Sequence, residues 1–92
     1  MEKLKDKFEV VRVMKVRELL NSGSVIPRDY VFGSAKIKLY KELKSKGYND
    51  DDEVIIAWRH YFRKEDTFGV YVHILKAFDN NLNEIAFATD YD

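Results

Sequence analysis

The sequence predicts an α+β fold, with an antiparallel sheet of three to four strands and a C-terminal β-meander packed against one or two helices. Residues 34–47 have helical periodicity, and residues 53–91 contain runs rich in β-branched and aromatic side chains. Only short polar breaks separate those runs, which favours antiparallel neighbours. With 92 residues and no internal repeat, the chain is expected to form one domain over residues 1–92.

The N-terminal segment has two interpretations. The valines that crowd residues 10–16 are β-branched, which favours a strand from about Phe8 to Val13 and then a short helix that ends near Asn21. The alternative is one continuous helix that begins at Glu2. Single-sequence patterns leave both interpretations open.

A connector over residues 24–33 precedes the clearest helix of the sequence. Pro27, the only proline, suits the first position of a helical turn. Ser34 is a candidate N-cap for the segment AKIKLYKELKSKG, in which apolar residues cover one broad arc and lysines cover the other. Gly47 is placed for a left-handed C-terminal cap.

Three strands are expected after this helix, at about Glu53–Arg63, Phe68–Phe78 and Glu84–Tyr91. The breaks between them, KEDT and DNNLN, are rich in residues that tolerate turn conformations. Alternation along each strand then assigns side chains to two faces.

We expect one face to be the core, because it is mostly apolar and contains the only tryptophan. Its predicted members are Val54, Ile56, Trp58, His60 and Phe62 of the first strand, with Val70, Val72 and Ile74 of the second. The opposite face mixes cations with aromatic and aliphatic side chains, a composition typical of protein interfaces. The partner-binding residues predicted on it are Arg59, Tyr61, Arg63, Tyr71, His73, Leu75 and Phe87.

The predicted function is therefore that of a small, non-enzymatic protein-interaction module of the adaptor or inhibitor type. Its partner is expected to be another protein or a second copy of the chain in a homodimer. The last strand could also offer an edge for β-augmentation.

The alternative is a nucleic-acid-binding domain, in which aromatic rings stack on bases and cations contact phosphates. A formal net charge of zero weakens it, because such binding would need a local basic patch. The residues expected to carry this function are Lys38, Lys41, Lys44, Arg59 and Arg63.

Metal, cofactor and catalytic sites are not predicted. His60 and His73 are expected on opposite faces, and the carboxylates of residues 49–53 lack the glycine and spacing of a calcium loop. Glu65 and Asp66 are adjacent in a turn and diverge, whereas an acid–base pair must converge on a pocket. Nucleotide-binding glycine motifs and a serine nucleophile elbow are also absent from the sequence.

The composition favours a cytoplasmic protein. The chain has no cysteine, which excludes disulfides and thiol chemistry. Its N-terminus lacks the apolar region of a signal peptide, and no apolar run approaches the ~20 residues that span a membrane.

Overall fold

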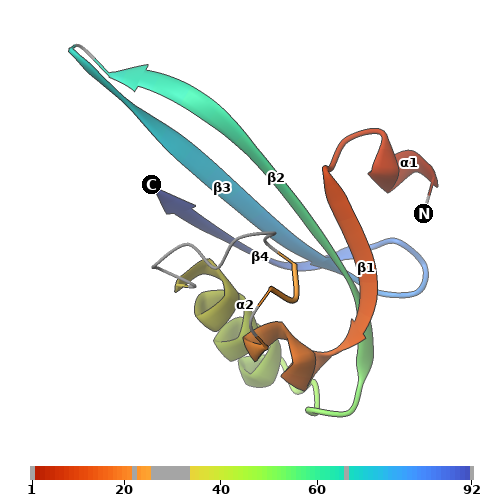
Figure 1. Ribbon diagram of the computed structural model, residues 1–92. Coiled ribbons are helices and arrows are strands. Elements are labelled where there is room, and N and C mark those ends of the chain that lie inside the picture. The colour runs from red at the N-terminus through yellow and green to blue at the C-terminus, as the bar shows by residue number, and fades with distance from the viewer. Residues whose placement is uncertain (1, 22, 26–33, 66, 92) are drawn as a thin grey trace.

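The computed structural model of the protein describes residues 2–21, 23–25, 34–65 and 67–91. Its centre is a four-stranded antiparallel sheet in the order β1-β2-β3-β4. Helices pack on this sheet, which confirms the predicted α+β class and the C-terminal meander (Figure 1). The elements are α1 (Glu2–Lys5), β1 (Val10–Lys15), the 3₁₀ helix η1 (Val16–Leu20), α2 (Ser34–Ser45), β2 (Glu53–Glu65), β3 (Phe68–Phe78) and β4 (Glu84–Tyr91).

The N-terminal segment forms a strand and then a short helix, as the first interpretation predicted. The strand begins at Val10 rather than Phe8, and the alternative of one continuous helix is wrong because α1 ends at Lys5. The helix after the strand is 3₁₀ rather than α. The Glu18 carboxylate accepts a hydrogen bond of 3.0 Å from the Lys15 N–H, which satisfies a backbone donor at the start of this helix.

The C-terminus of α2 confirms the predicted glycine cap. Gly47 has a φ of +95°, in the left-handed region that glycine adopts without steric cost. Its N–H donates to the Lys44 carbonyl oxygen, and the Tyr48 N–H donates to that of Leu43, both at 3.1 Å. This pair of bonds is a Schellman motif, and it ends the helix at a defined residue.

Two further expectations concern the helices. The helical turn predicted at Pro27 falls within residues 26–33, outside the described residues. Of the helices that the structure describes, none has both the length and the apolar character needed to cross a membrane.

The register of the β2–β3 hairpin corrects the predicted core face. Trp58 pairs with Leu75, and His60 pairs with His73. Directly opposed residues of an antiparallel pair lie on the same face, so Leu75 and His73 belong with Trp58. The prediction for the second strand is therefore wrong, and the following residues point to the other face: Val70, Val72 and Ile74.

The error arose because the faces of the two strands were matched by apolar composition. Glu65 pairs with Phe68, so two residues separate the strands, and each even-numbered residue of β2 is opposite an odd-numbered residue of β3. The predicted four-residue turn between Arg63 and Phe68 implies the same offset. Register, and not composition, decides which residues of two strands share a face.

The main core lies between α2, η1 and the Trp58 face of the sheet. Trp58 is almost fully buried, and its indole Nε1–H donates to Nδ1 of the buried His73 at 3.1 Å. This bond satisfies two polar atoms that would otherwise be costly in an apolar interior. The largest fully buried side chains around it are Leu19, Leu39, Leu43, Ile56, Leu75, Val16, Val25 and Val54.

A smaller core lies on the opposite face, beneath α1. Its buried members are Leu4, Ile55, Ala57 and Phe78. The Phe8 ring packs edge-on against the Phe78 ring, with centroids 6.2 Å apart. This cluster anchors the N-terminus, and it covers only one corner of that face.

The β2–β3 hairpin extends beyond the strands that flank it (Figure 1). β1 pairs with β2 only as far as Trp58, and β4 pairs with β3 only from Val72 onward. Beyond these points β2 and β3 form a two-stranded ribbon with side chains exposed on both faces. The Phe62 ring lies over Gly69, where it occupies the space that any larger side chain would need.

A polar cluster ties the loop after α2 to that helix. The Tyr40 hydroxyl donates to the Asp50 carboxylate at 2.7 Å, and the Lys44 ammonium lies 3.1 Å from the same oxygen. The hydrogen bonds from Tyr40 and Lys44 lower the pKa of Asp50 below its ordinary value of 3.8, and the bond from Tyr40 makes the larger contribution.

Trp58→Ala is expected to lower the free energy of unfolding by about 3–5 kcal/mol, because it removes a buried aromatic side chain and the donor to His73. Urea denaturation followed by circular dichroism measures the change. Phe87→Ala, at an exposed aromatic residue of the same sheet, is the control and should cost less than about 0.5 kcal/mol. Equal losses in the two variants would contradict the assignment of the core face.

Asp50→Asn is expected to lower the melting temperature at pH 7. Because folding lowers the pKa of Asp50, the stabilisation by its carboxylate is present above pH 3.8 and is lost as the pH falls below that value. The difference in melting temperature between the wild type and Asp50→Asn should therefore shrink below pH 3.8 in calorimetric scans. A difference that stays constant from pH 7 to pH 3 would contradict this mechanism, and the adjacent Asp51→Asn is the control.

Candidate functional site

Part of the sheet surface is not covered by any of the helices that the structure describes. α1 covers only the corner that contains Ile55, Ala57 and Phe78, and α2 packs on the opposite side of the sheet. The remaining outward side chains of β2, β3 and β4 form a surface that we call the helix-free face. Its described residues are Arg59, Tyr61, Arg63, Phe68, Val70, Val72, Ile74, Phe87, Thr89 and Tyr91.

A row of three side chains crosses the centre of the helix-free face. Val72 of β3 lies opposite Tyr61 of β2 and opposite Tyr91 of β4. Val72 is buried, whereas Tyr61 and Tyr91 are 42% and 53% exposed. The two rings therefore shield Val72 and still present apolar surface to solvent. Phe87, farther back along β4, adds a third aromatic ring that is 55% exposed.

An arginine lies against each tyrosine of this row. The Arg59 guanidinium carbon is 6.0 Å from the centroid of the Tyr61 ring, and that of Arg63 is 5.3 Å from the centroid of the Tyr91 ring. These distances are within the range of cation–π attraction. Each arginine–tyrosine pair therefore presents a cation and an aromatic ring side by side on the surface.

Among the described side chains of the helix-free face and its border, cations outnumber carboxylates. Arg59 and Arg63 lie on the face, and Lys7 and Lys76 lie beside it near α1. The carboxylate at this border belongs to Glu84, and Lys76 neutralises it in an ion pair of 2.8 Å.

Carboxylates elsewhere in the fold are paired with cations of their own surroundings. Asp50 contacts Lys44 of α2, and Asp51 contacts Arg17 of η1 at 2.6 Å. A locally basic surface attracts acidic partners.

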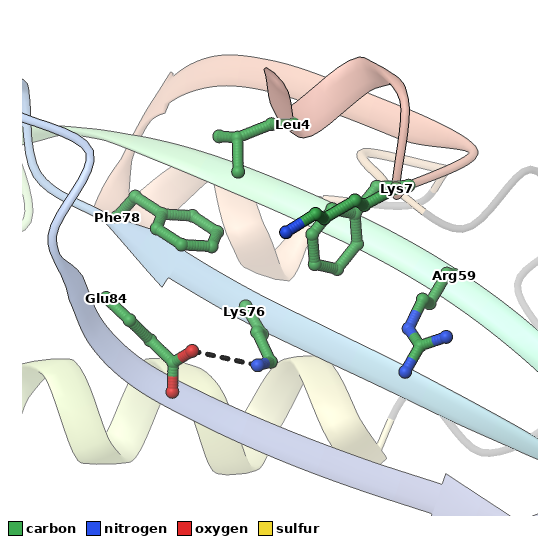
Figure 2. A pocket seen from close by; sticks show the side chains of 7 residues that line it. Leu4, Lys7, Arg59, Lys76, Phe78 and Glu84 are labelled. Atoms are coloured by element: carbon green, nitrogen blue, oxygen red, sulfur yellow. Dashed lines mark ion pairs between the residues drawn. The ribbon is translucent and has the colours of Figure 1, made fainter.

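A pocket of about 450 Å³ opens beside the helix-free face, between α1 and the sheet (Figure 2). Leu4, Phe8 and Phe78 supply its apolar wall. Its charged lining consists of Lys7, Arg59, Lys76 and Glu84. Figure 2 shows the Lys7 side chain extending over the pocket from the α1 side, while Arg59 and Lys76 rise from the sheet. Arg59 thus belongs both to the pocket and to the helix-free face.

The structure divides the predicted partner-binding residues between two faces. The helix-free face contains Arg59, Tyr61, Arg63 and Phe87. Tyr71, His73 and Leu75 lie on the Trp58 side, which contradicts the prediction that all seven share one face. His73 and Leu75 are buried in the core, so they are not available to a partner. Tyr71 is 46% exposed, but on the other side of the ribbon, where its ring contacts that of Phe62.

The basic residues predicted for nucleic-acid binding are also divided. Lys38, Lys41 and Lys44 belong to α2, on the side of the sheet opposite Arg59 and Arg63. They do not form one surface with the two arginines. Lys44 is moreover engaged in the ion pair with Asp50.

The two histidines share a face, in contrast to the prediction. The centroids of the His60 and His73 rings are 5.8 Å apart, with the ring planes nearly parallel. His60 Nδ1 lies 2.6 Å from the Glu9 carboxylate, and His73 Nδ1 accepts the bond from Trp58. Within the described ranges, no three His, Asp or Glu side chains are grouped to hold a metal ion.

Sequence reasoning missed Tyr91, Lys7 and Lys76 as members of this region. Alternation along the last strand does place Tyr91 on the side of Phe87, but only the register puts it beside Val72. Lys7 reaches the pocket because α1 folds back over the sheet, and no local sequence pattern reveals that contact.

Comparisons of the chain with protein-family models, with curated proteins and with solved structures find no match. Its binding properties are therefore inferred from its own surface.

Proposed function

We propose that the protein is a non-enzymatic protein-interaction module that binds an acidic surface of a partner protein through the helix-free face. The observation that carries the proposal is the Tyr61–Val72–Tyr91 row, with an arginine against each tyrosine ring. Tyrosine and arginine are the residue types most enriched, with tryptophan, among those that dominate binding energy at protein interfaces.

The exposure of these side chains supports the proposal energetically. Tyr61, Phe87 and Tyr91 leave apolar rings in water, with exposed fractions of 42%, 55% and 53%. Each ring has few rotatable bonds, so ordering it at an interface costs little conformational entropy. A partner that covered the rings would remove their apolar surface from water, which is favourable.

The charge of the face supports an acidic partner. Arg59 and Arg63 lie among the rings, and the neighbouring Lys7 adds a third cation. Complementary charge increases the rate of association and favours partners of opposite sign.

Single-stranded nucleic acid is the second candidate, favoured by the same combination of cations and aromatic rings. Base stacking, however, requires an open ring face. Tyr61 and Tyr91 each already have a guanidinium against the ring. A base would have to displace or share that contact, so we place a protein partner first.

The test begins with affinity capture of partners from the native host, with the wild-type protein and with the double variant Tyr61→Ala/Tyr91→Ala. The affinity of each purified partner for the two proteins is then measured by calorimetry. Each of the two truncations is expected to weaken binding by about 2 kcal/mol or more, as at other interface hot spots. Arg63→Glu is a second variant, because it reverses a surface charge without removing a ring.

Tyr71→Ala is the matched control, since Tyr71 has a similar exposure on the other side of the same ribbon. It should leave the affinity unchanged. A partner that binds the double variant and Arg63→Glu as tightly as the wild type would overturn the proposal. Sedimentation of the same proteins reveals whether the partner is a second copy of the chain.

Oligonucleotide titrations distinguish the second candidate. Single- and double-stranded oligonucleotides are titrated at two salt concentrations, because phosphate contacts make affinity fall steeply with salt. We expect no binding at low salt. Salt-sensitive binding that is lost in Arg63→Glu would favour a nucleic acid over a protein as the partner of this face.

A further inference from the structure

The pocket beneath α1 combines an apolar wall with cations that its own lining does not neutralise. Of its charged residues, Glu84 and Lys76 neutralise each other at 2.8 Å. For Lys7 and Arg59, no carboxylate lies within ion-pair distance in the part of the chain that the structure describes. The pocket therefore has a net positive charge beside apolar surface, and it favours an anion.

The apolar wall restricts what that anion is attached to. Leu4, Phe8 and Phe78 line the pocket with hydrocarbon, and two of them also belong to the buried cluster under α1. A hydrated inorganic anion would gain nothing from this wall. A ligand that fills the space must bring an apolar group and a negative charge close together.

Among protein segments, a C-terminal residue meets this requirement best. It carries an apolar side chain and a free carboxylate on the same Cα, whereas an internal aspartate or glutamate places its charge at the end of the side chain itself. Arginine and lysine are suited to a carboxylate, with hydrogen bonds strengthened by charge. Capture of a terminal carboxylate is a recurring mode of peptide recognition.

We infer that the pocket binds the C-terminal residue of the protein partner, with its apolar side chain against Leu4, Phe8 and Phe78 and its carboxylate between Lys7 and Arg59. The inference rests on the proposed function, because Arg59 joins the pocket to the helix-free face. It adds a requirement that the helix-free face does not impose, namely that the partner chain ends at this point in an apolar residue.

Short peptides test the pocket separately from the partner. The probe is the acetylated tetrapeptide Ac-Gly-Ser-Gly-Leu with a free carboxylate, titrated into the isotopically labelled protein and followed by NMR chemical shifts. We expect shifts centred on Lys7, Phe8 and Phe78. The same peptide with an amidated C-terminus should bind at least about tenfold more weakly, since it loses charge-assisted hydrogen bonds. Ac-Gly-Ser-Gly-Gly, which lacks the apolar side chain, should also bind more weakly.

Lys7→Gln is the informative variant, because it removes a pocket cation and leaves the tyrosines and arginines of the helix-free face in place. This variant should bind the free-carboxylate peptide about tenfold more weakly than the wild type does, whereas its affinity for the amidated peptide should change little. Lys41→Gln makes the same change on the exposed side of α2 and should have no effect. Tyr91→Ala should impair partner binding by the helix-free face but not peptide binding by the pocket.

Several results would overturn the inference. Equal binding of the acid and amide peptides, equal binding to Lys7→Gln, or no shifts at the pocket would each do so. Preferential binding of uridine 5′-monophosphate at the same residues would assign the pocket to a nucleotide instead. None of these results alters the prediction for Tyr61 and Tyr91, so failure of the inference is distinguishable from failure of the proposed function.

Discussion

Glu65 and Phe68 pair across a two-residue turn, and the composition of both sheet faces depends on this register. It places Leu75 and His73 beside Trp58, where the indole N–H finds its acceptor within the core. It also places Val72 between Tyr61 and Tyr91 on the opposite side. A shift by one residue would move every side chain of β3 to the other face and leave the indole without its acceptor. The core and the candidate site are therefore two consequences of one constraint.

The helices cover the two faces of the sheet unequally, and the site results from that inequality. α2 and η1 bury the Trp58 face, whereas the short α1 reaches only the corner around Ile55 and Phe78. The boundary of α1 creates the pocket, because its side chains form one wall and the sheet forms the floor. Beyond that boundary Tyr61, Phe87 and Tyr91 are exposed in the part of the chain that the structure describes.

The charged residues on the two sides of the sheet have different partners. Carboxylates of the loop before β2 are paired with cations of α2 and η1, as in the contacts of Asp50 and Asp51. The arginines near the projecting ribbon contact tyrosine rings within the helix-free face. The helix-free face thus combines cations with exposed aromatic rings. The binding role that we propose rests on this combination of exposure and charge.

The sequence by itself determined the helix over residues 34–45, the three C-terminal strands and the glycine that ends α2, because these depend on local propensity, alternation and turn chemistry. It also identified Arg59, Tyr61, Arg63 and Phe87, four residues of the helix-free face. Only the tertiary structure decided that Leu75 and His73 are core residues, that Tyr91 completes the row and that Lys7 borders the pocket. The physical reason is that strand register and the packing of α1 bring together residues distant in sequence, and no local pattern records those contacts.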